Sequence, residues 1–310
     1  MNKVCKKISI IAVCALGVGL VVGILGFVMG GAQSIVLEKN GFRVLSSADY
    51  EEVDYVDETF ADVKSLKVDV DYFDKVILSE GSTFSVKGNN AKSLGGLDAS
   101  LNAGTLTVST KKSHGIQLFN FGFFTSKAVN SGTLEITYPS GATLDKVDLI
   151  IDLGNLEMYD LNADKIMLDV DTGKAYLERI SASTLNGDMD LGDIEMKDAD
   201  IKSSTIKCDT GQVKIKNIQS EGMDIDSNLG SVYVEGTLKG KNVFDIDTGD
   251  LELILNQSRG ETSYFIDTDL GNVNIDGDNR FGSIENRVSG STSDLHINSD
   301  LGDVKIMFNK

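Results

Sequence analysis

The chain has no tryptophan, a single proline and only two histidines among its 310 residues. One proline excludes a collagen-like or proline-rich stalk. The two histidines, His114 and His296, lie far apart, and neither stands within a serine or cysteine nucleophile motif. The sequence also has no phosphate loop, zinc-ligand spacing or dinucleotide-binding fingerprint. We therefore expect no enzymatic activity, with a polysaccharide-cleaving β-helix as the enzymatic alternative.

Cysteine is also scarce, with three residues in all. Cys5 and Cys14 lie beside or within an apolar N-terminal segment, so Cys208 is the lone cysteine of the body. One cysteine cannot form an internal disulfide, which agrees with an exported domain built without such bridges. Cys208 follows Ile206 in an alternating apolar pattern, and this predicts a small buried side chain.

Basic residues are in short supply: 29 lysines and arginines face 47 aspartates and glutamates, for a net charge of −18. This balance argues against a nucleic-acid partner, because nucleic-acid binding needs a basic surface. An acidic domain stays soluble and is repelled by an anionic membrane surface. The apolar share of 41% is ordinary for a folded chain.

Charge is absent altogether from residues 8–37, and residues 8–32 form a nearly continuous apolar run. At about 1.5 Å per residue, this run can span a hydrocarbon core of about 30 Å as a helix. Three lysines precede it, so we predict a single-pass protein of the cell membrane with a cytoplasmic N-terminus and an extracytoplasmic C-terminal domain. A cleaved signal peptide ending in the small residues Gly30 to Ala32 is the alternative.

The body repeats one short motif: an acidic residue or asparagine, any residue, glycine, a polar residue, then two apolar residues separated by one position. Its glycines are Gly154, Gly173, Gly192, Gly211, Gly230, Gly249, Gly271 and Gly302. The first six are 19 residues apart, and the last two follow at 22 and 31. The alternating apolar positions are typical of β-strands, and glycine at each corner supplies backbone freedom. The fixed period predicts an all-β fold, a parallel β-solenoid (β-helix) whose turns of about 19 residues share one core.

A solenoid also needs caps, because an open apolar end and free strand edges invite association. The weaker repeats near the start and the longer spacing near the end indicate where these caps lie. The expected organisation is a cytoplasmic N-terminus at 1–7, a transmembrane helix at 8–32, an acidic tether at 33–60, irregular first turns with a cap at 61–150, regular turns at 151–275, and final turns with a C-terminal cap at 276–310.

Several segments carry a resemblance to a known family. They are the alternating segment 65–71, Gly88-Asn89-Asn90, Tyr138-Pro139 and the repeated Asp-x-Gly motifs. Together they resemble the bacterial putative-adhesin family of β-strand repeats, a domain of unknown function, over roughly residues 60–310. The resemblance implies a membrane-anchored protein on the surface of a Gram-positive bacterium, and it implies no site residues.

Aspartates occupy the same position in successive turns: Asp152, Asp171, Asp190, Asp209 and Asp247, with Asn228 once. Carboxylates stacked about 4.8 Å apart repel by about 1 kcal/mol per pair in water, so something must offset that repulsion. Hydrogen bonds at the corners are the simpler expectation. The alternative is Ca²⁺ bound as a cofactor by carboxylates of neighbouring turns, since this ion takes about six to eight oxygen ligands.

Aromatic side chains supply the other candidate contacts. Four phenylalanines fall within six residues: Phe119, Phe121, Phe123 and Phe124. They lie between Gly104 and Gly132, an interval nine residues longer than the regular period of 19. They either plug the end of the core or form an exposed patch that contacts a partner or the membrane interface. Tyr159, Tyr176 and Tyr233 are expected to face outward.

These features favour a membrane-anchored binding or adhesion module displayed on the cell surface, with a surface protein or glycan as its ligand. The alternative is an envelope-sensing or regulatory protein that docks onto a membrane-protein partner through Phe119 to Phe124 or the N-terminal helix.

Overall fold

The computed structural model describes the backbone of six segments: residues 35–38, 41–44, 53–91, 96–110, 116–119 and 132–309. The predicted cytoplasmic N-terminus at 1–7 and transmembrane helix at 8–32 lie outside these segments. Within them, no helix is long and apolar enough to cross a membrane. Most of the described residues belong to β-strands, as the alternating pattern predicts.

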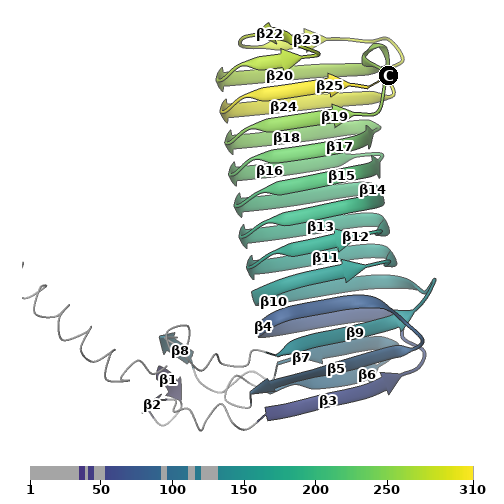
Figure 1. Ribbon diagram of the computed structural model, residues 1–310, viewed down its shortest axis with the longest axis vertical. Coiled ribbons are helices and arrows are strands. Elements are labelled where there is room, and N and C mark those ends of the chain that lie inside the picture. Colours follow the sequence, from purple (N-terminus) through teal and green to yellow (C-terminus); the bar gives the residue numbers. More distant parts are fainter. Residues whose placement is uncertain are drawn as a thin grey trace, which may run out of the picture.

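The regular body is a stack of parallel strands that winds upward as a rod (Figure 1). Its strands are β10 (Thr143–Tyr159), β11 (Asn162–Thr172), β12 (Ala175–Glu178), β13 (Ser181–Leu191), β14 (Ile194–Thr210), β15 (Val213–Ser220), β16 (Met223–Leu229), β17 (Val232–Leu238), β18 (Gly240–Thr248) and β19 (Leu251–Leu255). Residues 19 apart are paired, as in Ile166 with Leu185. The expected β-solenoid with 19-residue turns is confirmed.

The core runs along the axis of the rod because each turn sends alternate side chains inward. In one turn the buried side chains are Leu161, Ala163, Ile166, Leu168, Val170, Ala175, Leu177 and Ile180. The step of two residues typical of a strand lengthens at three places, after Ala163, Val170 and Leu177. The chain therefore bends three times per turn.

The repeated glycines stack at one of these bends. Seven of the eight have φ between +143° and +155°, a region that side chains rarely adopt. A Cβ on Gly192 would lie 1.6 Å from the carbonyl oxygen of Gly173 in the preceding turn. Glycine is therefore required both by conformation and by the close approach of successive turns.

Another bend, which the sequence pattern did not reveal, holds non-glycine residues in the left-handed region. Asp160, Arg179, Asp198 and Asn217 are 19 residues apart and have φ between 53° and 57°. Their side chains join neighbouring turns: Arg179 donates to Asp160 at 2.9 Å, and Asn217 donates to Asp198 at 2.6 Å.

The first turns do not stack in sequence order. Strand β4 (Ser65–Gly81) pairs in parallel with β10 on one side and with β7 (Thr105–Ser109) and β9 (Thr133–Pro139) on the other. Antiparallel strands then complete this end: β5 (Phe84–Ala91) on β9, β3 (Val53–Phe60) on β5, and β6 (Asp98–Asn102) on β7. The end of the stack is thus covered by antiparallel pairing rather than left as an open parallel edge.

The predicted acidic tether at 33–60 is wrong over its last eight residues. Residues 53–60 form β3, whose backbone pairs with β5 despite its acidic side chains. Strands β1 (Ile35–Glu38) and β2 (Gly41–Val44) form an antiparallel hairpin, and β8 (Ile116–Phe119) joins it in a separate three-stranded sheet.

The C-terminal end also departs from sequence order. Strands β24 (Ser293–Leu301) and β25 (Val304–Phe308) lie between β18/β19 and β20 (Thr262–Leu270)/β21 (Val273–Ile275). The turn made by β20 and β21 is therefore the outermost one, and a short helix, η4 (Arg259–Glu261), leads into it. On this outer turn, β22 (Asp278–Arg280) pairs antiparallel with β21, and β23 (Ile284–Asn286) pairs antiparallel with β20. In Figure 1 the yellow strands accordingly lie one turn below the end of the rod.

Residues 276–310, predicted to hold final turns and a C-terminal cap, contain strands of both kinds, but these strands do not follow sequence order along the rod. The cap consists of the outer turn with β22 and β23, and the last strands belong to the body. The irregular glycine spacings of 22 and 31 arise because the chain leaves one turn empty and then returns to fill it.

Candidate binding surfaces

The aspartates two residues before each glycine form an acidic column on the outside of the rod. Burial, with the nearby carboxylates of Asp71 and Asp171, raises the pKa of Asp152 to about 6. Burial and neighbouring aspartates also raise the pKa of Asp169 and Asp245, which lie two residues before the column positions Asp171 and Asp247. The column is a region of strong negative potential whose carboxylates destabilise one another.

The expected hydrogen-bonded corners exist, but a different residue makes them. The side chain directly after the glycine accepts a hydrogen bond from a backbone N–H of the adjacent turn: Asn155 from Lys174 at 3.0 Å, and Asp193 from Gln212 at 3.1 Å. Asp250 and Asp303 make equivalent bonds at 2.9 and 2.8 Å. The polar position after glycine was visible in the repeat, but its role was not.

The predicted calcium ligands do not form a coordination site in the described part of the chain. No group of three or more histidine, cysteine, aspartate or glutamate side chains there is arranged to hold a metal ion. The predicted ligands Asp152, Asp171, Asp190, Asp209 and Asp247 lie in single file along the rod, one per turn, and so do not converge on one point.

The tyrosines lie on a second outer face, formed by the strands that follow the glycines. Tyr159, Tyr176 and Tyr233 are half-buried, and each hydroxyl donates to a glutamate two residues away, at 3.2, 2.6 and 2.9 Å. The hydrogen bond to Glu178 and burial raise the pKa of Tyr176 to about 12.

Most side chains around these tyrosines are already paired. The rings of Tyr159 and Tyr176 are 5.8 Å apart, and the Nζ atom of Lys216 lies 5.9 Å from the ring centre of Tyr233. Lysine–glutamate pairs cross the turns at 2.7 to 3.3 Å, as in Lys75–Glu157 and Lys214–Glu195. This face is stabilised within itself and offers few free polar groups.

The predicted phenylalanine contacts lie mostly beyond the described residues. Only the backbone of Phe119 is described, at the end of β8. Phe121, Phe123 and Phe124 fall outside, and both interpretations of this segment stay predictions.

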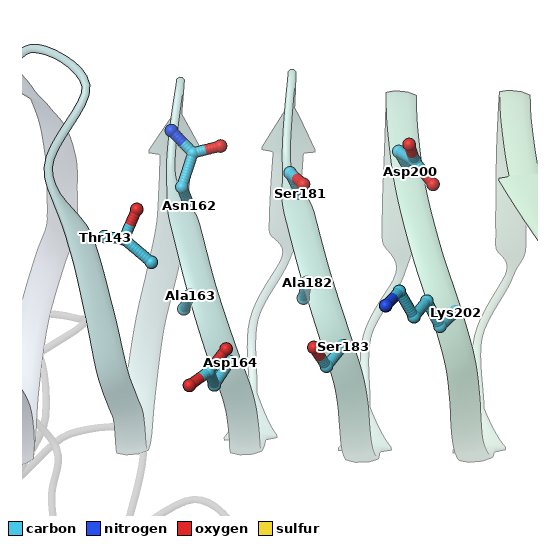
Figure 2. A pocket seen from close by; sticks show the side chains of 9 residues that line it. All are labelled: Thr143, Asn162, Ala163, Asp164, Ser181, Ala182, Ser183, Asp200 and Lys202. Atoms are coloured by element: carbon cyan, nitrogen blue, oxygen red, sulfur yellow. The ribbon is translucent and has the colours of Figure 1, made fainter.

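A third surface is hollowed. An open hollow of about 260 Å³ crosses successive turns of the rod. Figure 2 shows the side chains that line it. One row of polar side chains supplies one residue per turn: Thr143, Asn162, Ser181 and Asp200. A second row, two residues further along each strand, holds Asp164, Ser183 and Lys202. We call this hollow the polar groove.

Alanines explain why the surface is hollowed here. Ala163 and Ala182 lie between the two polar rows, at inward positions where the flanking turns carry Leu144 and Ile201. A second open hollow, of about 450 Å³, adjoins the groove and shares Ser181 and Asp200 with it. The sequence signal was present as two alanines in register, but only a comparison across turns would have found it.

The polar side chains of the groove are free of internal partners. Within the described segments, none of the seven makes a hydrogen bond or ion pair with another residue. Hydroxyl, amide, carboxylate and ammonium groups are all represented, so the groove can both donate and accept hydrogen bonds. The groove differs in this from the tyrosine face, where hydroxyl, carboxylate and ammonium groups already form hydrogen bonds and ion pairs with one another.

Comparison with protein families identifies the fold. The family model described as Toastrack DUF4097 matches residues 63–307. The chain belongs to this Toastrack family. The match covers the solenoid from just before β4 to the last residues of β25, and it leaves out β3.

Solved structures with similar folds are distant in sequence. A "putative adhesin" from Bacteroides fragilis is 12% identical, with a TM-score of 0.43, and the match covers 83% of this chain and 97% of that one. A "putative lipid binding protein" from Parabacteroides distasonis is also 12% identical, with a TM-score of 0.38 and coverage of 84% and 98%. A "putative cell adhesion protein" from Clostridium sporogenes is 11% identical, with a TM-score of 0.28 and coverage of 83% and 100%. No curated protein matched the Toastrack chain.

Proposed function

We propose that this Toastrack protein is a membrane-anchored, extracytoplasmic binding module displayed at the cell surface. The apolar run at 8–32 anchors it in the cell membrane, and the rod carries the binding surface outward. The observation that carries the binding role is the polar groove, whose seven polar side chains make no hydrogen bond or ion pair with any other residue that the structure describes. We assign the protein no catalytic step.

The ligand that suits the groove is a segment of a linear glycan. Polar groups recur in it at every turn, about 4.8 Å apart, over a length of about 14 Å. A sugar chain presents hydroxyl groups that both donate and accept, at a comparable repeat along its length. Small-molecule sites are usually enclosed and apolar, whereas this groove is open and polar, so an extended polymer fits it better.

The test fills the groove with side chains that the same rows already tolerate. In Ser181→Gln/Ser183→Lys, the new residues match Gln219 and Lys202, which occupy these rows in later turns. The full chain in detergent micelles is titrated with purified envelope polysaccharide and with chitotetraose, and binding is measured by calorimetry. We expect at least tenfold weaker binding with an unchanged melting temperature.

The matched control is Asn186→Lys, which adds the same charge on the outward face of β13 outside the groove. It should bind as the wild type does. Absence of glycan binding by the wild type, or equal loss in both variants, would contradict the assignment. The alternative function is envelope sensing or regulation by docking onto a membrane-protein partner, and crosslinking on intact cells tests it. Crosslinks to integral membrane proteins would favour this alternative.

A further inference from the structure

The residue directly before each corner glycine forms a further column, whose side chains are half-buried or exposed. In stacking order this column reads Leu153, Thr172, Leu191, Thr210, Leu229, Thr248, Leu301 and Leu270. Leucine and threonine alternate until the last two positions. Leu191, Leu229, Leu301 and Leu270 are 56%, 53%, 50% and 67% exposed. We call these four residues the leucine ridge.

The ridge is held straight by the backbone beneath it. Six of the eight corner glycines donate their N–H to the carbonyl of the residue in this column one turn further along the rod, as from Gly192 to Thr210 at 2.9 Å and from Gly211 to Leu229 at 3.0 Å. Leucines two turns apart are therefore separated by about 9.6 Å, with threonine methyl groups between them. Scattered surface leucines need no explanation, but an aligned row of them is typical of an interaction site.

The aspartates beside the ridge restrict which kind of partner can bind there. The acidic column lies one residue away, as Asp190 beside Leu191 and Asp300 beside Leu301, and only Leu229 has a neutral neighbour there, Asn228. A second copy of this rod would place carboxylates against carboxylates, and an anionic lipid surface would also be repelled. A partner that covers the leucines must bring basic groups to the flank, because buried or partly buried carboxylates need compensating charge.

The spacing indicates the shape of that partner. On an α-helix, side chains seven residues apart lie on one face and about 10.5 Å apart. The leucine spacing of about 9.6 Å is about 0.9 Å shorter than this helical spacing. Flexible side chains can accommodate that mismatch along a row of three leucines. An extended strand presents successive same-face residues at about 6.7 Å, which fits neither one turn nor two.

We propose that the leucine ridge is a docking surface for a cationic amphipathic α-helix of a partner polypeptide. The apolar stripe of the helix contacts the leucines and threonine methyl groups, and its lysines or arginines lie against the acidic column. This inference does not depend on the glycan ligand of the groove, which lies on other residues.

The probe is a synthetic three-heptad peptide with leucine at both apolar positions of every heptad and lysine beside them. Its binding to the full chain in detergent micelles is followed by fluorescence anisotropy. The variant Leu191→Thr/Leu229→Thr/Leu301→Thr keeps the fold, because threonine occupies this corner position in alternate turns. We expect it to bind at least tenfold more weakly and to melt at the wild-type temperature.

Two further variants separate apolar contact, charge and a general loss of surface hydrophobicity. Asp190→Asn/Asp300→Asn introduces the residue that Asn228 already places in the same column, and it should weaken binding and reduce its dependence on salt. Tyr55→Thr removes a side chain that is 60% exposed on β3, at the opposite end of the rod from Leu270, and should change nothing.

The proposal is overturned if the leucine variant binds like the wild type, or if a peptide with glutamate in place of lysine binds equally well. It is also overturned if sedimentation velocity shows dimers that the leucine variant abolishes, since the ridge would then serve a second copy of this chain.

Discussion

Gly192→Ala should destabilise the solenoid strongly, although it adds a single methyl group. Gly192 has φ of +153°, where a residue with a Cβ costs about 1–3 kcal/mol. The new Cβ would also lie 1.6 Å from the Gly173 carbonyl oxygen, so the two turns must separate. Separation weakens the corner bonds from Gly173 to Leu191 and from Gly192 to Thr210, at about 1 kcal/mol each. The sum is about 3–5 kcal/mol.

The measurement is thermal unfolding followed by far-UV circular dichroism. At about 2–4 °C per kcal/mol for a chain of this size class, the melting temperature should fall by at least about 6 °C. The control is Gly187→Ala in the same turn, where the nearest atom to a new Cβ is a side-chain carbon of Ile194 at 3.8 Å. It should change stability by less than about 1 kcal/mol. Equal melting of the two variants would refute the argument that stacked corners require glycine.

Three further predictions follow from other parts of the fold. Asp152→Asn should raise stability at pH 7 by up to about 1 kcal/mol after solvent screening, because the folded pKa of about 6 lies above the ordinary value of 3.8 and penalises the charged form. The gain should disappear as the pH falls from 6 to 4, and denaturant titrations across that range will check it. Cys208 is buried, and burial raises the pKa of its thiol to about 11. In a Cys5→Ser/Cys14→Ser background, Cys208 should therefore react with a thiol reagent only after unfolding. Prompt labelling of the folded chain would contradict this. Deletion of residues 293–310 should expose the core faces of β18 and β20 and increase binding of a hydrophobic dye, whereas wild-type dye binding would show that the inserted strands are dispensable.

The regular turns could be predicted because every turn repeats the same constraints. Glycine, its polar successor and two alternating apolar residues recur at a fixed period, and each position has one structural role. The stacking order at the ends could not be predicted in this way. Ile266 and Ile297 both suit the inward position beside Phe244, so the apolar pattern alone does not decide which strand takes that place.

The candidate surfaces were predicted less completely. Strand alternation placed Tyr176 and Tyr233 on an outer face. It could not show that each tyrosine hydroxyl already donates a hydrogen bond to a neighbouring glutamate. The acidic column was visible, yet its members lie in single file and do not converge as metal ligands would. The polar groove and the leucine ridge depend on neighbours 19 residues apart in sequence, and a pattern followed along the chain does not compare such residues.

The insertion of β24 and β25 also sets the order in which the chain can fold. Phe244 on one side and Ile266 on the other both pack toward a position that only Ile297 fills. The last two turns therefore cannot close while β24 and β25 are still in the ribosome or in an export channel. A simple solenoid could grow turn by turn as it emerges, but this one must wait for residues 293–308, and contacts over such long sequence separations form slowly. Emergence of β24 and β25 thus becomes a condition for closing the turn that precedes them in sequence.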